Sequence, residues 1–376
     1  MASIMPAEMT TSDARKEKTE TLPLSIISRK PISRRLVVQQ DSSNGEQVVA
    51  TPSRLPTVGI VMRTKDRAVL LRRALESVRD QTHADWKLVV VNDGSAPEQV
   101  DWLVDRMFAH DPRVLVIHHA SSRGMEAASN AGLAQLDTDY AAIHDDDDSW
   151  APEFLATMLT TLQHRQREFP SIRGIACRAN RVHETVIGNE IIIERVEPHN
   201  SWDFDNIYNG ILSIQPMILR NLFPSICFIF DLSVARNIGL FDESLPVLGD
   251  WDFNTRFLMH SDIWMCPEFL SFHHHRSSAT GSLGNNVLYG AQKHRLYNQL
   301  LRNKIIRTTN NHSGTDIANL IMSMEIYETL KLEFGHLIWK SYQIDNSINA
   351  LKRPHRKPLR SLTRRIESLF KRIVQA

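Results

Sequence analysis

Short apolar runs alternate with helical patterns between residues 57 and 144. The apolar runs predict buried strands at Val58–Met62, Lys87–Val91, Val114–His118 and Tyr140–His144. Between them, apolar residues recur at helical spacing and predict helices at Asp66–Gln81, Pro97–Ala109 and Gly124–Gln135. Apolar strands that alternate with helices are typical of a parallel sheet covered on both faces. We therefore expect an α/β fold.

The pattern is less regular after residue 170. Further strands are predicted at Ile172–Ala179, Glu190–Val196 and Ser225–Asp231, and a helix is expected after Gly249. From Leu288 onward only helices are predicted, with a break near 308–314. We expect four parts: a flexible or loosely docked extension (1–55), an α/β domain (56–285), a helical region (286–351) and a basic tail (352–376).

Charge and cysteine content exclude several classes of protein. The 44 Lys+Arg and 43 Asp+Glu residues give a net charge of +1, which argues against the overall basic field of a nucleic-acid binder. The three cysteines, Cys177, Cys227 and Cys266, are far apart, so we expect no disulfide framework or zinc ribbon. No apolar signal segment or membrane-spanning run is visible, and the expected location is cytoplasmic.

The tail differs from the rest of the chain. Between Lys352 and Arg372 it holds nine Lys/Arg residues and one Glu, and its apolar residues fall at helical spacing. A basic amphipathic helix of this kind can lie on the anionic inner face of a membrane. The alternative is a helix that packs on its own domain or pairs with another chain. Nucleic acid is not expected as a partner, because the tail lacks interleaved aromatic residues.

Polar residues follow each of the first four predicted strands. They are Arg63–Arg67, Asn92–Ser95, the loop that leads to Arg123, and Asp145–Asp148. In an open parallel sheet, ligands bind at the carboxyl ends of the strands. We therefore expect these groups to converge on one edge of the sheet.

The four adjacent carboxylates of Asp145–Asp148 repel one another unless a cation offsets their charge. Mg²⁺ and Mn²⁺ take oxygen ligands and often complete their shell with substrate phosphates. On an extended chain, Asp145 and Asp147 would face one site. The alternative is a solvated loop or a cap for the helix that starts near Pro152. The chain has neither GxGxxG nor GxxxxGK[ST], so metal and arginine would have to hold a phosphate-bearing ligand.

A family resemblance emerges from these segments. PTVGIVMRTKDR (56–67), VVVNDGS (89–95), RGMEAASNAGL (123–133) and YAAIHDDDDSW (140–150) follow one another like the motifs of family 2 glycosyltransferases. GLFDESLPVLGDWDFNTR (239–256) resembles the acceptor-side motif of that family, and FHHHRSS (272–278) its late His/Arg–Ser motif. The resemblance implies a GT-A fold, with a mostly parallel mixed sheet and helices on both faces.

The resemblance also implies a reaction: metal-dependent, inverting transfer of a sugar from a UDP, GDP or dTDP donor to a hydroxyl group. The acceptor would be a glycan or lipid-linked, as in cell-surface polysaccharide biosynthesis, and the cofactor Mn²⁺ or Mg²⁺. It implies metal ligands at Asp145, Asp147 and His275, with His273 as the alternative on the same strand face. The residues that it assigns to the nucleotide sugar are Thr64, Asp66, Asp93, Arg123, Asp145 and Asp146.

By the same resemblance, Asp250 is the catalytic base, and Asp252 is the base if the alignment is shifted. The family usually has Glu-Asp here, whereas this chain has Gly249-Asp250. That departure favours an alternative function, a catalytically silent sugar-nucleotide or glycan-binding module. Another alternative is that Asp250 only caps the helix Trp251–Met259.

Purely structural interpretations exist for other candidates. They are an Asx turn at Asp93, a surface arginine at Arg123, a buried strand residue among His273–His275, and core packing for Trp150, Trp202 and Trp251.

Overall fold

The computed structural model describes residues 56–199, 210–276, 291–308 and 314–351. The expectations for the extension (1–55) and the basic tail (352–376) lie outside the described residues. So do Trp202, Ser277 and Ser278.

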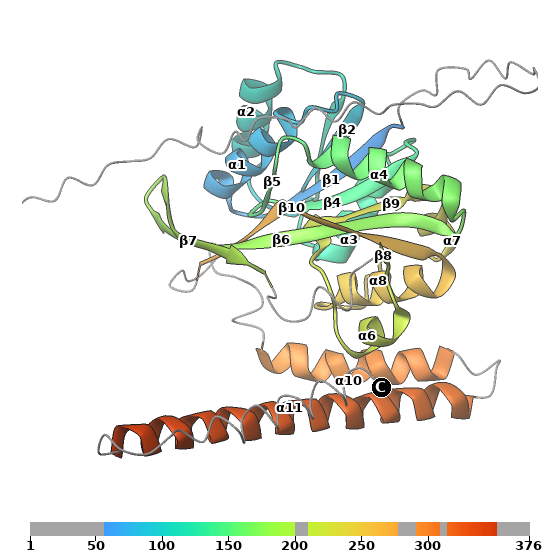
Figure 1. The fold of residues 1–376 in the computed structure, drawn as a ribbon. Coiled ribbons are helices and arrows are strands. Elements are labelled where there is room, and N and C mark those ends of the chain that lie inside the picture. Colours follow the sequence, from blue (N-terminus) through green and yellow to red (C-terminus); the bar gives the residue numbers. More distant parts are fainter. Residues whose placement is uncertain (1–55, 200–209, 277–290, 309–313, 352–376) are drawn as a thin grey trace, which may run out of the picture. The chain divides into compact units, whose positions relative to one another are not determined.

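A mixed sheet forms the centre of the fold (Figure 1). Its order is β3-β2-β1-β4-β9-β6-β10-β5, with β7 paired to β6 and β8 to β10. The strands are β1 (Val58–Thr64), β2 (Trp86–Asn92), β3 (Val114–His118), β4 (Tyr140–Asp145), β5 (Ser149–Trp150), β6 (Ile172–Ile187), β7 (Glu190–Pro198), β8 (Gly210–Ile211), β9 (Phe228–Asp231) and β10 (Asp262–His275). The first four strands are parallel, as their apolar runs predict.

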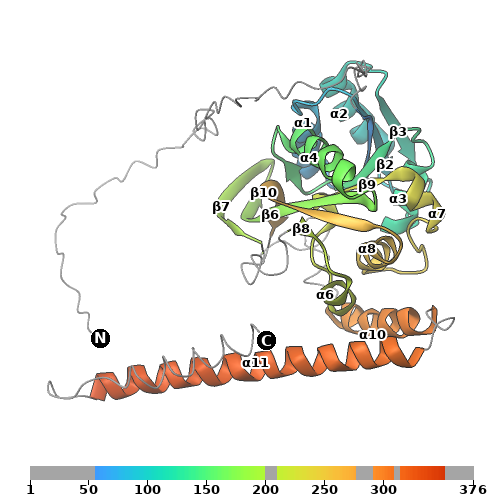
Figure 2. The same ribbon diagram turned by 45° about the vertical axis from the view of Figure 1, so that its right-hand side comes forward.

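Helices cover both faces of the sheet. The helices that the structure describes are α1 (Ala68–Arg79), α2 (Pro97–Phe108), α3 (Met125–Leu133), α4 (Phe154–Glu168), α6 (Ile214–Leu219), α7 (Leu232–Asn237), α8 (Gly249–His260), α10 (Ala291–Thr308) and α11 (Gly314–Leu351). In Figures 1 and 2, α1, α2 and α4 lie on one face, and α3, α7 and α8 lie on the other. The expected α/β architecture is confirmed.

The second half of the sheet departs from the sequence pattern. β9 is antiparallel to both β4 and β6, and the expected strand Ser225–Asp231 begins as a 3-10 turn at Ser225–Cys227. The sequence predicts strand residues only around His273–His275, whereas β10 spans Asp262–His275. Pro267 and Glu268 interrupt the apolar run of β10, where the register against β6 shifts between Cys266 and Phe269. Proline cannot donate a ladder hydrogen bond, so a bulge accommodates it.

The register of β1 places two loops side by side. Thr64 pairs with Asn92 on β2, and Arg63 pairs with Asp145 on β4. The carboxyl ends of β1, β2 and β4 therefore stop at the same level. This alignment puts the polar segments that follow the three strands at one edge of the sheet, as the sequence predicts.

Helix α10 is joined to the α/β domain through polar and apolar contacts. Lys304 Nζ donates to Asp242 at 2.7 Å and to Asp252 at 2.8 Å, and Arg302 donates to the backbone oxygen of Leu219 at 3.0 Å. Leu301 is buried in the same core as the sheet. Among the described helices, none combines the length and the apolar character that crossing a bilayer requires.

Candidate functional site

A cavity of about 840 Å³ lies at the carboxyl ends of β1 and β4 and is bordered by α3, α8 and β10. Two of the predicted site residues, Arg123 and Asp252, do not line this cavity. The predicted residues that do line it are Thr64, Asp66, Asp93, Asp145, Asp146, Asp147, Asp250 and His275. The structure therefore brings together most of the candidates from segments far apart in the sequence.

The acidic run reaches the cavity through a turn. β4 ends at Asp145, and the backbone N–H of Asp148 donates to the carbonyl oxygen of Asp145 at 3.2 Å. The extended chain that was expected over Asp145–Asp147 is therefore absent. Asp145 and Asp147 still line one cavity, because the turn brings the later carboxylates back beside the end of the strand.

Arginines offset the charge of the run. Arg63 Nε donates to Asp145 at 3.0 Å, and Arg67 Nη1 donates to Asp147 at 3.2 Å. Arg276, which is fully buried, also pairs with Asp147. Burial opposes the charge of Asp147, yet Arg276 and Arg67 hold its pKa below the usual range. The expected repulsion is thus relieved by protein cations.

The two other acids of the run are more deeply buried. Asp146 accepts a hydrogen bond from Thr64 Oγ1 at 2.8 Å, and burial beside Asp147 raises the pKa of Asp146 to about 7. Asp148 accepts the backbone N–H of His274 at 2.9 Å, and burial raises its pKa well above the usual value. These contacts tie the run to β1 and β10.

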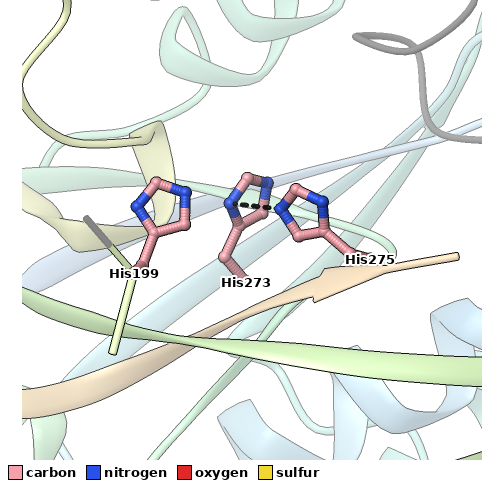
Figure 3. Close-up of side chains that lie close together, drawn as sticks. All are labelled: His199, His273 and His275. Carbon is pink, nitrogen blue, oxygen red and sulfur yellow. Dashed lines mark hydrogen bonds between the residues drawn. The ribbon is translucent and has the colours of Figure 1, made fainter. Parts of the chain in front are cut away.

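The three consecutive histidines separate into two roles. His274 is buried, 2.7 Å from Glu184 and 2.8 Å from Ser149 Oγ, so it is the buried strand residue expected among the three. His273 and His275 turn to the cavity instead. There His199, at the end of β7, joins them: the three imidazoles offer nitrogen atoms within 4.8 Å of one another (Figure 3).

These cavity histidines are neutral. Burial, together with neighbouring histidines and Arg181, lowers the pKa of His199 and His275 to about 3. Burial also lowers the pKa of His273 to about 4, against the attraction of Asp147. Neutral imidazole is the metal-binding form. His199 was missed in the sequence because no motif surrounds it.

The cavity wall carries two kinds of metal ligand. Among the described residues, His199, His273 and His275 form the group whose ligand atoms lie within 4.8 Å of one another, so these imidazoles could hold one ion. Asp145 and Asp147 line the same cavity but do not belong to that group. Their carboxylate oxygens suit Mg²⁺ and Mn²⁺. An ion on Asp147 would compete with two guanidinium groups for the same carboxylate.

Asp93 organises the loop that leads into α3. Its two oxygens accept hydrogen bonds from the backbone N–H groups of Arg123 (2.8 Å) and Gly124 (3.0 Å), and Ser122 Oγ donates at 2.7 Å. Burial opposes the charge, but these bonds keep the pKa of Asp93 below its usual range. Arg123 extends its side chain over the surface, 3.7 Å from Glu243.

The Asx turn predicted as an alternative role for Asp93 is formed instead by its neighbour, Asn92. The Oδ1 of Asn92 accepts the backbone N–H of Ser95 at 3.0 Å. Asp93 therefore does not form the Asx turn, and its carboxylate accepts hydrogen bonds from the 119–124 loop instead.

Asp250 lies in the first turn of α8, whose N-cap is Leu248. Asp250 is therefore not the cap of that helix. Asn221 Nδ2 donates to its Oδ2 at 2.7 Å, and the backbone N–H of Trp251 donates to its Oδ1 at 2.8 Å. Burial raises the pKa of Asp250 in spite of these bonds. A held carboxylate of raised basicity at a cavity wall can accept a proton from a bound hydroxyl group.

Asp252 has a different environment. It is buried, it accepts from Arg256 Nε at 2.7 Å and from Lys304 at 2.8 Å, and it is not part of the cavity wall. These contacts favour a structural role for Asp252, in which its carboxylate joins α8 to α10. Trp150 and Trp251 are also core residues, because both are buried and their ring N–H groups donate to backbone oxygens.

Comparison with known proteins adds to this picture. Residues 59–204 match the profile of glycosyl transferase family 2, so the family resemblance is confirmed over this part of the chain. The relative WcaA of Escherichia coli K12, whose name assigns it provisionally to colanic acid biosynthesis, is 33% identical over 113 residues. These are 30% of this chain and 39% of that protein.

A second relative is the pre-mycofactocin glycosyltransferase of Mycobacterium tuberculosis H37Rv. It is 28% identical over 235 residues, which are 62% of this chain and 46% of that protein. The chain thus spans less than half the length of each of these two relatives.

Among solved structures, the mannosyltransferase PcManGT of Pyrobaculum calidifontis, in complex with GDP-Man and Mn²⁺, has a TM-score of 0.47 and 14% identity. The match covers 77% of this chain and 86% of that one. The TarS fragment 1–349 of S. aureus with UDP-GlcNAc has a TM-score of 0.47 and 17% identity, with 60% and 62% covered. The family match and the mixed sheet agree with the expected GT-A fold.

Proposed function

We propose that this chain, whose residues 59–204 match glycosyl transferase family 2, transfers a sugar from a nucleotide-diphosphate donor to a hydroxyl group of an acceptor. One observation carries the proposal: a single cavity holds both the acidic run at the end of β4 and the half-buried carboxylate of Asp250 on α8. A transferase of this kind needs one side that holds a cation for the donor diphosphate and another side that carries a base. They come here from segments about 100 residues apart.

Asp250 is the proposed base. Its carboxylate is held by Asn221 and by the first turn of α8, and its raised pKa brings it closer to the working pH. The acceptor hydroxyl gives its proton to Asp250 while its oxygen attacks the anomeric carbon of the donor sugar. The diphosphate leaves from the opposite face. A single displacement of this kind inverts the anomeric centre.

The donor is proposed to bind along β1 and the acidic run. Thr64, Asp66, Asp145 and Asp146 line this side of the cavity, while Asp93 and the backbone of Arg123 shape its edge. Asp145, Asp147 and His275 would hold Mn²⁺ or Mg²⁺. When bound, the ion would offset the charge of the leaving diphosphate.

The acceptor and the setting are also proposals. A glycan or lipid-linked acceptor fits the relative named for colanic acid biosynthesis. UDP, GDP and dTDP donors remain candidates, since pocket shape sets that choice. A cytoplasmic protein that touches the inner face of a membrane through its basic tail fits the sequence.

Calorimetric titration of UDP, GDP and dTDP, each with and without Mn²⁺, tests the proposal. We expect one nucleotide to bind, and to bind more tightly with the metal. A folded protein that binds none of them would contradict the proposal. Nucleotide binding without sugar transfer to any acceptor would favour the alternative function, a catalytically silent sugar-nucleotide or glycan-binding module.

Asp250→Asn tests the base directly. The amide keeps the size of the side chain but cannot take a proton, so transfer should fall about 10²–10⁴-fold while nucleotide affinity is kept. The matched control is Asp101→Asn on α2, outside the cavity, which should transfer at the wild-type rate. Sugar transfer at the wild-type rate by Asp250→Asn would show that Asp250 is not the base.

A further inference from the structure

The cavity wall carries three neighbouring imidazoles, those of His199, His273 and His275, which we call the histidine cluster. Two of them come from the end of β10. His273 and His275 alternate along that strand, so their side chains leave the same face of the sheet. His274, between them, lies 2.7 Å from Glu184 instead. The alternation of the strand thus sets two imidazoles side by side at the cavity.

His199 reaches the same place from β7, which lies on the other side of β6 from β10. His273 pairs with Arg181 on β6, and Arg181 pairs with Glu197 on β7, two positions before His199. Strands separated by one other strand lie roughly 10 Å apart. The ring centroids of His199 and His273 are only 5.0 Å apart, so these side chains lean toward each other across β6.

The spacing of the ring nitrogens suits a single ion (Figure 3). Nitrogen ligands about 2.0–2.1 Å from a tetrahedral zinc ion lie about 3.3 Å from one another. Nε2 of His275 and Nδ1 of His273 already have this separation, at 3.3 Å. All three ligand atoms lie within 4.8 Å of one another, so His199 would close the set by a shift of at most about 1.5 Å.

The chemistry of the histidine cluster separates it from the acidic run. Its three ligands are all imidazoles, which suit zinc and other late first-row metals, whereas Mg²⁺ and Mn²⁺ prefer the oxygen ligands that Asp145 and Asp147 offer. Zinc sites with three histidines keep a fourth position for water. Because all three histidines line the cavity, that position would face it.

The surroundings of the histidine cluster include charges of both signs. Asp147 and Asp145 attract a positive charge at His273, and Arg181 repels it. Two carboxylates therefore stand against one guanidinium group, and a cation on the imidazoles would have counter-charges close by without using those carboxylates as ligands.

We infer that His199, His273 and His275 form a metal site of their own, which takes Zn²⁺ in preference to Mg²⁺ and is separate from the carboxylates proposed to hold the ion of the donor. The inference goes beyond the proposed sugar transfer and does not depend on it. It assigns His275 to the histidine cluster, so that Asp145 and Asp147 remain as the ligands of the donor's ion.

Calorimetric titration of the full chain with Zn²⁺, after removal of metal by a chelator and without nucleotide, tests the inference. We expect one tight site per chain. His199→Ala should weaken it by more than about 100-fold, because even the loss of a group that only orients a ligand costs 10–100-fold. Asp147→Asn should keep the tight site. Co²⁺ in place of Zn²⁺ should give the intense visible absorption of a tetrahedral site in the wild type but not in His199→Ala.

The matched control is His183→Ala. His183 lies on β6 beside the histidine cluster, with its ring centroid 6.2 Å from that of His275, but its Nε2 is 2.9 Å from Glu197. This variant should bind Zn²⁺ as the wild type does. A wild-type protein without a tight Zn²⁺ site would overturn the inference. So would a His199→Ala protein that binds Zn²⁺ as tightly as the wild type, or an equal loss of affinity in His183→Ala.

Urea denaturation shows whether the variants fold and gives a second readout. Zn²⁺ should raise the urea midpoint of the wild type and leave that of His199→Ala unchanged, because a ligand that binds only the native state stabilises it. If His199→Ala does not fold, His273→Ala and His275→Ala make the same test. Failure of the proposed function is recognised separately: the wild type would then bind no nucleotide, whether or not it binds Zn²⁺.

Discussion

At the scale of single residues, the acidic run after β4 is balanced by guanidinium groups from two other segments. Arg63 pairs with Asp145, while Arg67 and Arg276 pair with Asp147. Neutralising one of these aspartates therefore affects two interactions: the binding of an external cation and the ion pair with arginine.

Asp147→Asn should abolish the metal dependence of nucleotide binding, because the amide oxygen is a poorer ligand for a hard cation. Calorimetry with and without Mn²⁺ measures this. The control is Asp137→Asn, whose side chain is 75% exposed and lies outside the cavity. If affinity with Mn²⁺ is unchanged in Asp147→Asn but lost in His273→Ala, the metal belongs to the histidine cluster.

The residue-level predictions from sequence were strongest for groups that follow a strand. Asp145–Asp147 and Thr64 could be placed because strand ends share one edge of a sheet. Arg276 and Glu126 could not, since each acts through a partner more than 60 positions away. Such pairings depend on tertiary packing, which hydrophobic periodicity does not encode.

At the scale of elements, α8 carries two aspartates with opposite surroundings. Asp250 borders the cavity, whereas Asp252 is bonded to Arg256 on its own helix and to Lys304 on α10. One turn of helix thus serves both the site and the contact with α10.

Asp252→Asn should lower the free energy of unfolding by about 3 kcal/mol, since it leaves two cations facing a neutral group. The folded variant should still transfer sugar. Urea denaturation and a transfer assay at a temperature well below the transition check the two statements. Loss of transfer without loss of stability would instead favour Asp252 as the base.

A second network joins α1, β6 and β10. Glu184 is fully buried; Arg73 donates to it at 2.6 Å, Arg276 donates at 2.8 Å, and His274 Nδ1 lies 2.7 Å away. These partners come from helix α1 and from the end of β10, so Glu184 links three elements beneath the cavity.

Glu184→Gln should lower the free energy of unfolding by about 3 kcal/mol, because the guanidinium group of Arg73 loses a buried counter-ion and that of Arg276 keeps only Asp147. Urea denaturation measures the loss. The control is Glu194→Gln, on the exposed strand β7 of the same hairpin, which should change the free energy by less than about 0.5 kcal/mol. An equal effect at both positions would contradict the network's role.

At the scale of the whole molecule, the same network predicts how stability depends on pH. Burial alone would raise the pKa of Glu184, but His274 and Arg73 hold it at about 2, below its ordinary value of 4.5. The unfolded chain therefore binds this proton at higher pH than the folded one. The stabilisation by Glu184 is complete above about pH 4.5 and is lost as pH falls toward 2.

Urea midpoints of the wild type and of Glu184→Gln, compared from pH 6 to pH 3, measure this loss. The gap between the two proteins should narrow as the solution becomes more acidic. A gap that stays constant over this range would show that the Glu184 carboxylate does not titrate in the unfolded chain as argued.

The first half of the fold could be predicted from the sequence, whereas the second half could be predicted only in part. Four apolar strands with helices between them indicate the parallel half of the sheet, which the structure confirms. The full length of β10 could not be foreseen, because Pro267 and Glu268 interrupt its pattern and its partner β6 lies some 90 residues earlier. The long antiparallel and parallel pairings there are set by packing between distant segments.

The side chain of Glu126, in the first turn of α3, has a consequence for how such sequences can diverge. A Cβ on Gly249, at the start of α8, would lie 2.1 Å from Oε1 of Glu126, so any side chain at position 249 requires Glu126 to move. Among related chains we therefore expect a residue larger than glycine at the start of α8 to be accompanied by a smaller residue at the start of α3.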